Sequence, residues 1–202
     1  MAARWILATA NGHKVGEIAA ILAAAGSQVE LVPLPPGVTL PEETGNTFLA
    51  NARLKARAVV AATGQVALAD DSGLEVDALG GDPGVHSARY AGDGADDEAN
   101  NAKLLAALEG IHGPNRRARF RCVLVLARPD GAEVVAQGAI EGFILPALRG
   151  GAGFGYDPLF QPEGDARSLA EYPPDEKNRV SHRGQAVRQL LALLTARGGL
   201  EP

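Results

Sequence analysis

Residues 5–26, WILATANGHKVGEIAAILAAAG, decide the fold class. The four apolar residues at the start run into Asn11-Gly12, which is the pattern of a buried strand entering a tight loop. The apolar residues that follow recur at helical spacing: Val15, Ile18, Leu22 and Ala25. Gly26 stands where a helix C-cap glycine belongs. The stretch therefore predicts a strand followed directly by a helix.

The same alternation continues along the chain. Strand-like runs at 29–32 and 66–69 flank a helical pattern from Thr47 to Thr63, in which Lys55 interrupts the apolar face. A further helical pattern covers 96–108 and begins with three acidic residues, which suit the positive end of a helix dipole. The first half thus reads β-α-β-α-β, then loop, then helix.

The second half contains a hairpin. Strand patterns over 119–127 and 133–143 flank the turn Arg128-Pro129-Asp130-Gly131, which predicts an antiparallel pair. Glycine-rich segments over 70–94 and 150–157 are expected to be loops, Ser168 is expected to cap a short helix, and a last helix is expected over 185–196. These elements predict a single α/β domain over residues 1–202, with a mixed sheet flanked by helices.

The composition is that of an ordinary globular chain and excludes several classes. The 202 residues are 46% hydrophobic and 21% charged. No window approaches the roughly 18 apolar residues of a membrane span, and the apolar N-terminal run is too short for a signal peptide, so a cytoplasmic location is expected. Cys122 is the one cysteine, which excludes a disulfide framework and a cysteine-based zinc site. A net charge of −5 argues against binding to nucleic-acid polymers.

The charge is unevenly distributed. Residues 1–101 contain 6 Lys and Arg against 13 Asp and Glu, whereas residues 102–202 contain 13 against 11. An acidic half favours a cation site, with scattered solvated carboxylates as the alternative.

The first candidate site is the turn between the first strand and the first helix. Free backbone N–H groups at a helix start form an anion site, and Lys14 lies where the helix dipole disfavours a cation unless an anion accompanies it. An exposed surface lysine is the alternative. The residues of this candidate phosphate site are Thr9, Ala10, Asn11, Gly12, His13 and Lys14.

The second candidate is Asp70-Asp71-Ser72, expected just past the carboxyl end of a buried strand. Two adjacent carboxylates repel one another unless a cation or donors compensate, and carboxylate oxygens suit Mg²⁺. An Asx-turn is the alternative. Glu42 or Glu43 is a candidate further ligand, although either also suits a helix N-terminus.

The third candidate is the aromatic pair in Gly153-Phe154-Gly155-Tyr156-Asp157. An exposed ring can stack on a nucleobase, and Asp157 can accept a hydrogen bond from its edge. A loop anchored by its aromatics is the alternative. Lys177 and Ser181-His182-Arg183, expected before the last helix, offer cationic donors or simply solvated charge.

A further pattern suggests structure rather than chemistry. Arg117, Arg119 and Arg121 alternate with apolar residues, which predicts an edge strand with one polar face.

Six segments in order resemble the inosine triphosphate pyrophosphatase family. They are Thr9-x-Asn11-x-x-Lys14, Glu43-Thr44-Gly45-x-Thr47-Phe48, Asn51-Ala52-x-x-Lys55-Ala56, Ala69 to Tyr90, Phe154-Gly155-Tyr156-Asp157 and Ser181-His182-Arg183. Ala50 and His86 depart from the family pattern. The resemblance implies an elongated twisted sheet in two lobes with a cleft between them.

The same resemblance implies hydrolysis of inosine, deoxyinosine and xanthosine triphosphates to the monophosphate and pyrophosphate, with Mg²⁺, by a homodimer. It makes Asp71 the proton acceptor and a metal ligand, with Glu43 or, less favoured, Glu42 as the other ligand. The substrate contacts it implies are Thr9 to Lys14, Ser72, Phe154, Gly155, Tyr156, Asp157, Lys177, His182 and Arg183. A pyrimidine nucleotide pyrophosphatase and a nucleotide sensor without turnover are the alternatives.

Overall fold

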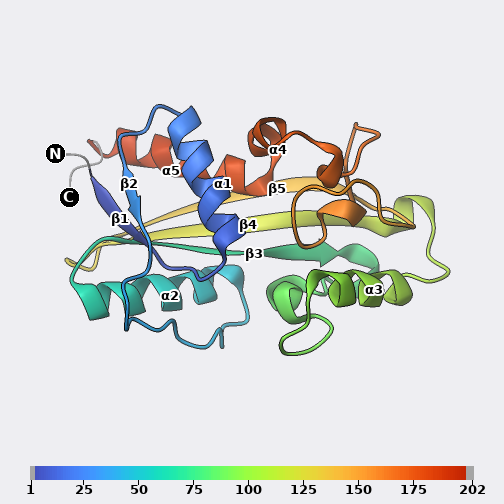
Figure 1. Ribbon diagram of the computed structural model, residues 1–202, viewed down its shortest axis with the longest axis horizontal. Helices are drawn as coiled ribbons and strands as arrows, with labels where there is room; N and C mark the ends of the chain where they lie inside the picture. Colours follow the sequence, from blue (N-terminus) through green and yellow to red (C-terminus); the bar gives the residue numbers. More distant parts are fainter. Residues whose placement is uncertain (1–2, 199–202) are drawn as a thin grey trace. The chain divides into compact units, whose positions relative to one another are not determined.

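The computed structural model describes residues 3–198 and contains one six-stranded sheet in the order β2-β1-β3-β4-β5-β6 (Figure 1). The strands are β1 (Arg4–Leu7), β2 (Glu30–Val32), β3 (Ala67–Val76), β4 (Arg117–Ala127), β5 (Glu133–Ile144) and β6 (Phe160–Pro162). The helices are α1 (Gly12–Ala24), α2 (Phe48–Thr63), α3 (Asp97–Ala107), α4 (Pro174–Val180) and α5 (His182–Ala196). Among the described residues, no helix is both long and apolar enough to span a membrane.

The sheet is mixed, as predicted. β1 pairs in parallel with β2 and with β3, because α1 and α2 return the chain to the same edge. β6 pairs antiparallel with β5. The predicted turn closes the β4–β5 hairpin, where Gly131 N–H donates to Arg128 O at 3.0 Å.

The chain forms two compact units. Unit 1 contains the chain up to Asp71, then Cys122–Gly138 and the chain from His182; unit 2 contains Ser72–Arg121 and Ala139–Ser181. The chain passes between them within β3, β4 and β5. The single domain, the elongated shape and the cleft stay predictions.

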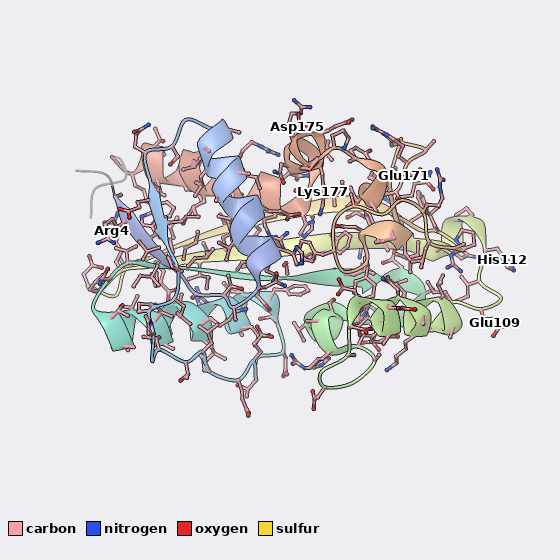
Figure 2. The ribbon with its side chains drawn as sticks, viewed as in Figure 1. Arg4, Glu109, His112, Glu171, Asp175 and Lys177 are labelled. Atoms are coloured by element: carbon pink, nitrogen blue, oxygen red, sulfur yellow. The ribbon has the colours of Figure 1, made fainter. Side chains whose placement is uncertain are left out.

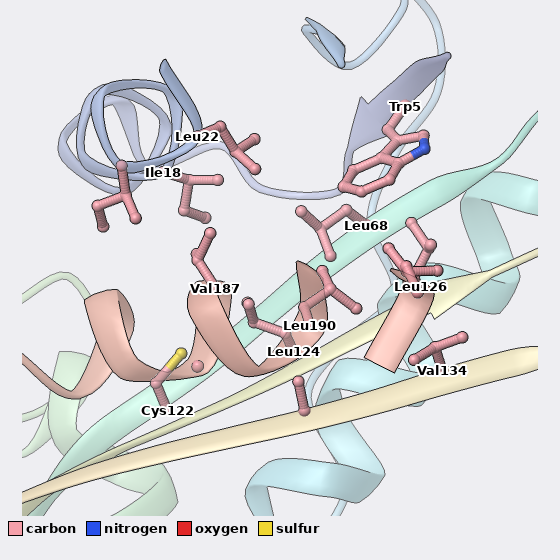
Figure 3. Close-up of a cluster of buried hydrophobic side chains, with 14 of the residues drawn as sticks. Trp5, Ile18, Leu22, Leu68, Cys122, Leu124, Leu126, Val134, Val187 and Leu190 are labelled. Atoms are coloured by element: carbon pink, nitrogen blue, oxygen red, sulfur yellow. The ribbon is translucent and has the colours of Figure 1, made fainter. Parts of the chain in front are cut away.

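In unit 1, α1 and α5 cover one face of the strands and α2 covers the other (Figure 1). Figure 3 shows Ile18 and Leu22 of α1 and Val187 and Leu190 of α5 directed toward Leu68 of β3 and Leu124 of β4, and all six side chains are buried. At Gly138 of β5, an added Cβ would lie 2.1 Å from His182 O, so only glycine admits this approach of α5. The start of α5 is therefore fixed against β5.

In unit 2, β3, β4 and β5 supply a second core. Leu104 and Leu108 of the α3 segment pack with Leu74 and Val76 of β3, and a larger group joins them: Ala118, Phe120, Ile140, Ile144, Tyr156, Leu159, Phe160, Leu169 and Tyr172. This core anchors the segment that follows β5.

Three sequence predictions about these elements were wrong. β3 does not end at Ala69 but continues to Val76, because β4 remains its neighbour and Leu74 and Val76 are buried. Asp70 and Asp71 therefore lie within β3, two and three residues past Leu68, the partner of the last residue of β1. The predicted loop over 70–94 begins only after Val76.

β4 is not an edge strand, since it lies between β3 and β5. Its arginines are half-buried because they form ion pairs with carboxylates of unit 2, such as Arg119 with Asp77 at 2.9 Å and with Glu141 at 3.0 Å.

Lys177 precedes the last helix, as predicted. It lies on α4, which begins at Pro174, a position where proline's fixed backbone suits a first helical turn. α5 begins at His182 rather than Gln185, so His182 and Arg183 occupy its first turn. Both residues are polar but buried, so the apolar pattern did not indicate where the helix begins.

Candidate functional site

The turn between β1 and α1 has the predicted position, and hydrogen bonds from its backbone to its own side chains stabilise it. Asn11 is the N-cap of α1, and its Oδ1 accepts from the N–H groups of His13 at 3.0 Å and Lys14 at 3.2 Å. Thr9 Oγ1 accepts from Asn11 N–H at 3.1 Å. The first turn of α1 contains no acidic residue, so the positive end of the helix dipole is left for an anion.

Lys14 is held by a buried carboxylate of β3. Its Nζ lies 2.5 Å from Oδ1 of Asp70, and only 15% of its side chain is exposed. The Asp70 side chain is fully buried and also receives Arg183 Nε of α5 at 3.2 Å and Cys122 Sγ of β4 at 3.1 Å. Arg183 forms a second ion pair with Glu17 of α1. These contacts join four elements of unit 1 at one carboxylate.

Burial alone would raise the pKa of Asp70, but the charges of Lys14 and Arg183 reverse this and hold its pKa well below the ordinary value. Asp70 is therefore an anion at any physiological pH.

A second buried cluster of unit 1 surrounds Lys55. Its Nζ lies 2.6 Å from Glu43 Oε1 and 3.1 Å from Asp71 Oδ1. α2 positions the lysine with Asn51 one turn earlier, whose Oδ1 accepts from Gly45 N–H at 2.7 Å. That contact ties the segment carrying Glu43 to α2.

Gly45 leaves no room for a side chain. An added Cβ would lie 2.6 Å from both Ala50 Cβ and Asn51 Oδ1. The close approach explains why glycine stands here.

Asp71 differs electrostatically from its neighbour. Burial raises its pKa to about 6, because the opposing charge of Lys55 is partly cancelled by the carboxylate of Glu43. The same two carboxylates raise the pKa of Lys55 in spite of its burial. Of the adjacent carboxyl groups of Asp70 and Asp71, Asp71 is thus the one that exchanges a proton near neutral pH.

The Lys55 cluster fits a divalent cation with an incomplete protein shell. Within residues 3–198, no group of three or more His, Cys, Asp or Glu side chains is arranged to hold a metal. Oδ2 of Asp71 is buried and, among the described residues, accepts no hydrogen bond. A buried carboxylate oxygen with no donor, near a second carboxylate, is what a hard cation sharing its other positions with water and phosphate requires. Glu43 fits better than Glu42, which is exposed.

The glycine loop of unit 2 forms a separate polar and aromatic cluster. Asp157 is buried, and its Oδ2 accepts from Phe154 N–H at 2.9 Å and Lys177 Nζ at 2.6 Å. Lys177 Nζ also lies 5.0 Å from the centre of the half-buried Phe154 ring. Figure 2 labels Lys177 on α4. Asp157 thereby fixes both the aromatic ring and the ammonium group that flank it.

Gly153 makes this arrangement possible. Its φ is +77°, and an added Cβ would lie 2.2 Å from Oδ2 of Asp157. Both the backbone conformation and the space exclude other residues.

Tyr156 fits the alternative prediction, in which the aromatics anchor the loop. It is 4% exposed, packs in the core of unit 2 and donates its hydroxyl to Ser87 O at 2.8 Å. Only Phe154 of the aromatic pair is available for stacking. Gly155 N–H donates to Asp97 of α3 at 2.6 Å, a contact that the sequence did not indicate.

The remaining predicted residues are placed as follows. Ser72 is half-buried on β3 directly after Asp71, in unit 2. His182 and Arg183 are buried in the first turn of α5, in unit 1. The structure brings Lys14 and Arg183 together through Asp70, and Phe154, Asp157 and Lys177 together in the glycine loop. Their substrate contacts stay predictions.

The sequence indicated no role for Lys55, and it placed Asp70 only in a candidate Mg²⁺ site with Asp71, not in contact with Lys14 and Arg183. Lys55 had a signal, because it is a charged residue on the apolar face of a helix, where its burial demands a partner. Asp70 had none beyond its adjacency to Asp71, since its partners come from distant segments.

Comparison with known proteins identifies close relatives along nearly the whole chain. Residues 5–193 match the model of the Ham1 family. A dITP/XTP pyrophosphatase of Desulforamulus reducens is 52% identical over 94% of this chain and 94% of its own, and one of Methylococcus capsulatus is 48% identical over 98% and 100%. A HAM1 protein from Coxiella burnetii, of known structure, is 42% identical over 96% of this chain and 99% of its own, with a TM-score of 0.87.

Proposed function

Because the chain belongs to the Ham1 family, we propose that it hydrolyses non-canonical purine nucleoside triphosphates, namely ITP, dITP and XTP, to the nucleoside monophosphate and pyrophosphate. Such an activity removes deaminated purines from the nucleotide pool before they enter DNA or RNA. The relatives at about half identity carry the names of dITP/XTP pyrophosphatases.

The single observation that carries this proposal is the Lys55 cluster. It combines a carboxyl group with a pKa of about 6, a second carboxylate and an ammonium group in contact with both. General-base catalysis is most effective when the pKa of the base lies near the working pH. In the metal-free protein, the pKa of Asp71 therefore suits the removal of a proton from an attacking water.

Mg²⁺ is the cofactor that we assign to Glu43 and Asp71. When bound, it would neutralise charge on the phosphates and polarise the reacting phosphoryl group. Lys55 holds the two carboxylates near one another in spite of their mutual repulsion, since its ammonium group contacts both. The chain thus supplies a prepared pair of oxygen ligands.

Lys14 and the start of α1 suit the triphosphate. The ammonium group, the positive end of the helix dipole and the absence of acidic residues in the first turn all favour a polyanion there. Thr9 to Lys14, with Asn11 as a rigid cap, are the residues that we assign to phosphate binding.

Phe154, Gly155, Tyr156, Asp157 and Lys177 suit the base. The ring of Phe154 offers a stacking surface, with Tyr156 anchoring the loop from within the core. The ammonium group of Lys177 donates hydrogen bonds and suits the 6-oxo group of hypoxanthine or xanthine, whereas the 6-amino group of adenine would leave it unmatched. Ser72, His182 and Arg183 complete the assignment. A homodimer in the cytoplasm belongs to the same proposal and rests on the family resemblance.

A panel of nucleotides tests the proposal. Purified protein with Mg²⁺ should release pyrophosphate from dITP, ITP and XTP at least about 100-fold faster than from ATP, GTP, CTP or UTP, a ratio that unpaired polar groups at a site can supply. Equal rates on all nucleotides would contradict the proposal. Preference for pyrimidines would indicate the related pyrimidine enzyme, and binding without turnover would indicate a sensor.

A further inference from the structure

Asp70 has no role in the proposed function, although it is the most buried charged group of unit 1. Its side chain is 0% exposed, and it binds two cations from two different helices. Burying an ion costs several kcal/mol, and a hydrophobic residue at such a position is often as stable. A carboxylate retained here requires an explanation beyond packing.

Asp70 offsets the repulsion between the two cations. Lys14 and Arg183 contact opposite oxygens of one carboxylate, so their charges lie within a few ångströms of each other. Two like charges that close together repel, and more strongly in a buried site than in water. The positive end of the α1 dipole adds to this repulsion at Lys14.

Three contacts of Asp70 have different consequences when the carboxylate is removed. Arg183 has a second carboxylate partner in Glu17, and Cys122 is a neutral thiol of the core. Of these three partners, Lys14 is the one that lies in the first turn of α1, and its side chain is partly exposed there. Loss of Asp70 would therefore release Lys14 first.

We propose that Asp70 is a positioning residue, which holds the ammonium group of Lys14 at the start of α1 so that a polyphosphate meets it already in place. The inference rests on the proposed function for the role of Lys14 in phosphate binding and for the identity of the polyphosphate. A group held ready costs less ordering when the ligand binds, and misplacement by about 1 Å can reduce turnover about 100-fold.

The direction of the binding effect separates this role from simple electrostatics. Removing a negative charge beside an anion site should tighten anion binding if only charge matters. If Asp70 positions Lys14, its removal should weaken binding instead, because Lys14 is repelled from its place.

A double-mutant cycle with two readouts tests the proposal. The variants are Asp70→Asn, Lys14→Met and the two combined, with Cys122→Ala as the matched control that removes a different contact of Asp70. The readouts are Kd for inorganic pyrophosphate with Mg²⁺, measured by calorimetry, and kcat/KM for dITP. Asp70→Asn should weaken pyrophosphate binding about 10-fold and lower kcat/KM about 100-fold, but should change each less than about 3-fold when Lys14 is already Met. Cys122→Ala should leave both within about 2-fold.

Tighter pyrophosphate binding in Asp70→Asn, or equal losses with and without Lys14, would overturn the proposal. If Asp70→Asn does not fold, Asp70→Glu takes its place in the cycle, because it keeps the charge and displaces the ammonium group by one methylene. The expected result is the same non-additivity with a smaller loss. Wild-type protein that binds pyrophosphate but releases none from dITP would contradict the proposed function, while the binding cycle would still decide the role of Asp70.

Discussion

Unit 1 and unit 2 both contain networks of ion pairs, but the two networks lie in opposite environments. In unit 1 the side chains of Lys14, Asp70 and Arg183 are at most 15% exposed. In unit 2 the arginines of β4 form ion pairs with carboxylates from outside that strand, namely Glu75, Asp77, Glu141 and Glu163. The arginine side chains are 26% to 42% exposed. The residue types are the same, so the difference lies in desolvation.

That difference separates charges that stabilise weakly from charges retained for chemistry. An exposed ion pair contributes about 0–1 kcal/mol, because water and salt screen it. A buried group of charges costs several kcal/mol to desolvate and is destabilised strongly when one partner is removed. Lys14 and Asp71, to which we assign phosphate and metal binding, belong to these buried groups of charges in unit 1. We infer that burial, rather than the number of ion pairs, marks the site.

Removal of the proposed base should have the largest effect. Asp71→Asn keeps the shape of the side chain and should lower kcat for dITP by about 1,000-fold or more, because general-base catalysis and metal binding both depend on this carboxylate. Steady-state kinetics and dITP binding measured by calorimetry test this prediction, and binding should remain measurable. Full activity in the variant would remove Asp71 from the mechanism.

Removal of the bridging lysine should have the next largest effect. Lys55→Met should lower kcat about 100-fold and shift the acidic limb of the pH profile of kcat/KM upward, since the pKa of Asp71 loses its main opposing charge. Lys103→Met is the matched control, because Lys103 lies on α3 and donates to Tyr90 O, and it should leave the profile unchanged. An unchanged profile in Lys55→Met would contradict the assigned role.

The pH dependence of stability should reveal the contrast between the two adjacent aspartates. The folded-state pKa of Asp71 is raised from 3.8 to about 6, so its contribution to stability is present below pH 3.8 and is lost as the pH rises through 6. The pKa of Asp70 is lowered, so its contribution is present above 3.8 and is lost only in strong acid. In metal-free protein, Asp71→Asn should therefore remove a fall in unfolding free energy on the order of 2 kcal/mol between pH 4 and 7.

Urea unfolding at several pH values in the presence of a chelator measures this slope. Asp93→Asn, in an exposed turn, is the control and should keep the wild-type slope. A wild-type slope in Asp71→Asn would show that burial does not perturb this carboxyl group.

The buried ion pair of unit 2 extends the comparison to the glycine loop. Gly153→Ala places a methyl group against Oδ2 of Asp157 and should raise KM for dITP about 10-fold, because Lys177 and Phe154 lose their common anchor. Gly151→Ala is the matched control, since an added Cβ there meets nothing within 4 Å, and it should behave as wild type. Equal KM values for the two variants would contradict the proposed anchoring by Asp157.

Removal of an exposed ion-pair partner on β4 should have the smallest effect on stability and activity. Arg119→Met removes ion pairs to three carboxylates but should cost less than about 1 kcal/mol of unfolding free energy and leave kcat/KM unchanged. Arg116→Met is the contrast within unit 2: Arg116 is buried and donates to four backbone carbonyls, so its loss should cost about 3 kcal/mol. Urea unfolding measures the loss of unfolding free energy in both variants. Equal losses would show that burial does not distinguish important charges from unimportant ones.

The sequence predicted those parts of the fold that depend on local periodicity. The order of elements, the mixed sheet and the hairpin of β4 and β5 all follow from apolar spacing and turn residues. The prediction failed where polar residues are buried by distant partners. β3 was expected to end before Asp70, and α5 to begin after Arg183, because a charge normally marks the surface.

The candidate site was predictable to the same extent. Thr9 to Lys14 lie on a motif whose geometry is local, and they are placed as expected between β1 and α1. Asp71 lies within β3 rather than past its carboxyl end, because the strand continues to Val76. Lys55 and Asp70 acquire their roles only through contacts across elements, such as Asp70 with Arg183, which are 113 residues apart. Burial of Tyr156 likewise depends on a core that the loop sequence does not reveal.

The central claim is that this chain cleaves a non-canonical purine triphosphate between its α- and β-phosphorus atoms. Phosphorus-31 NMR of dITP with Mg²⁺ and the wild-type protein tests it most directly, because each product has its own signal. We expect dIMP and pyrophosphate as the only initial products, with ATP unchanged over the same period. Formation of dIDP and orthophosphate, or equally rapid cleavage of ATP, would contradict it.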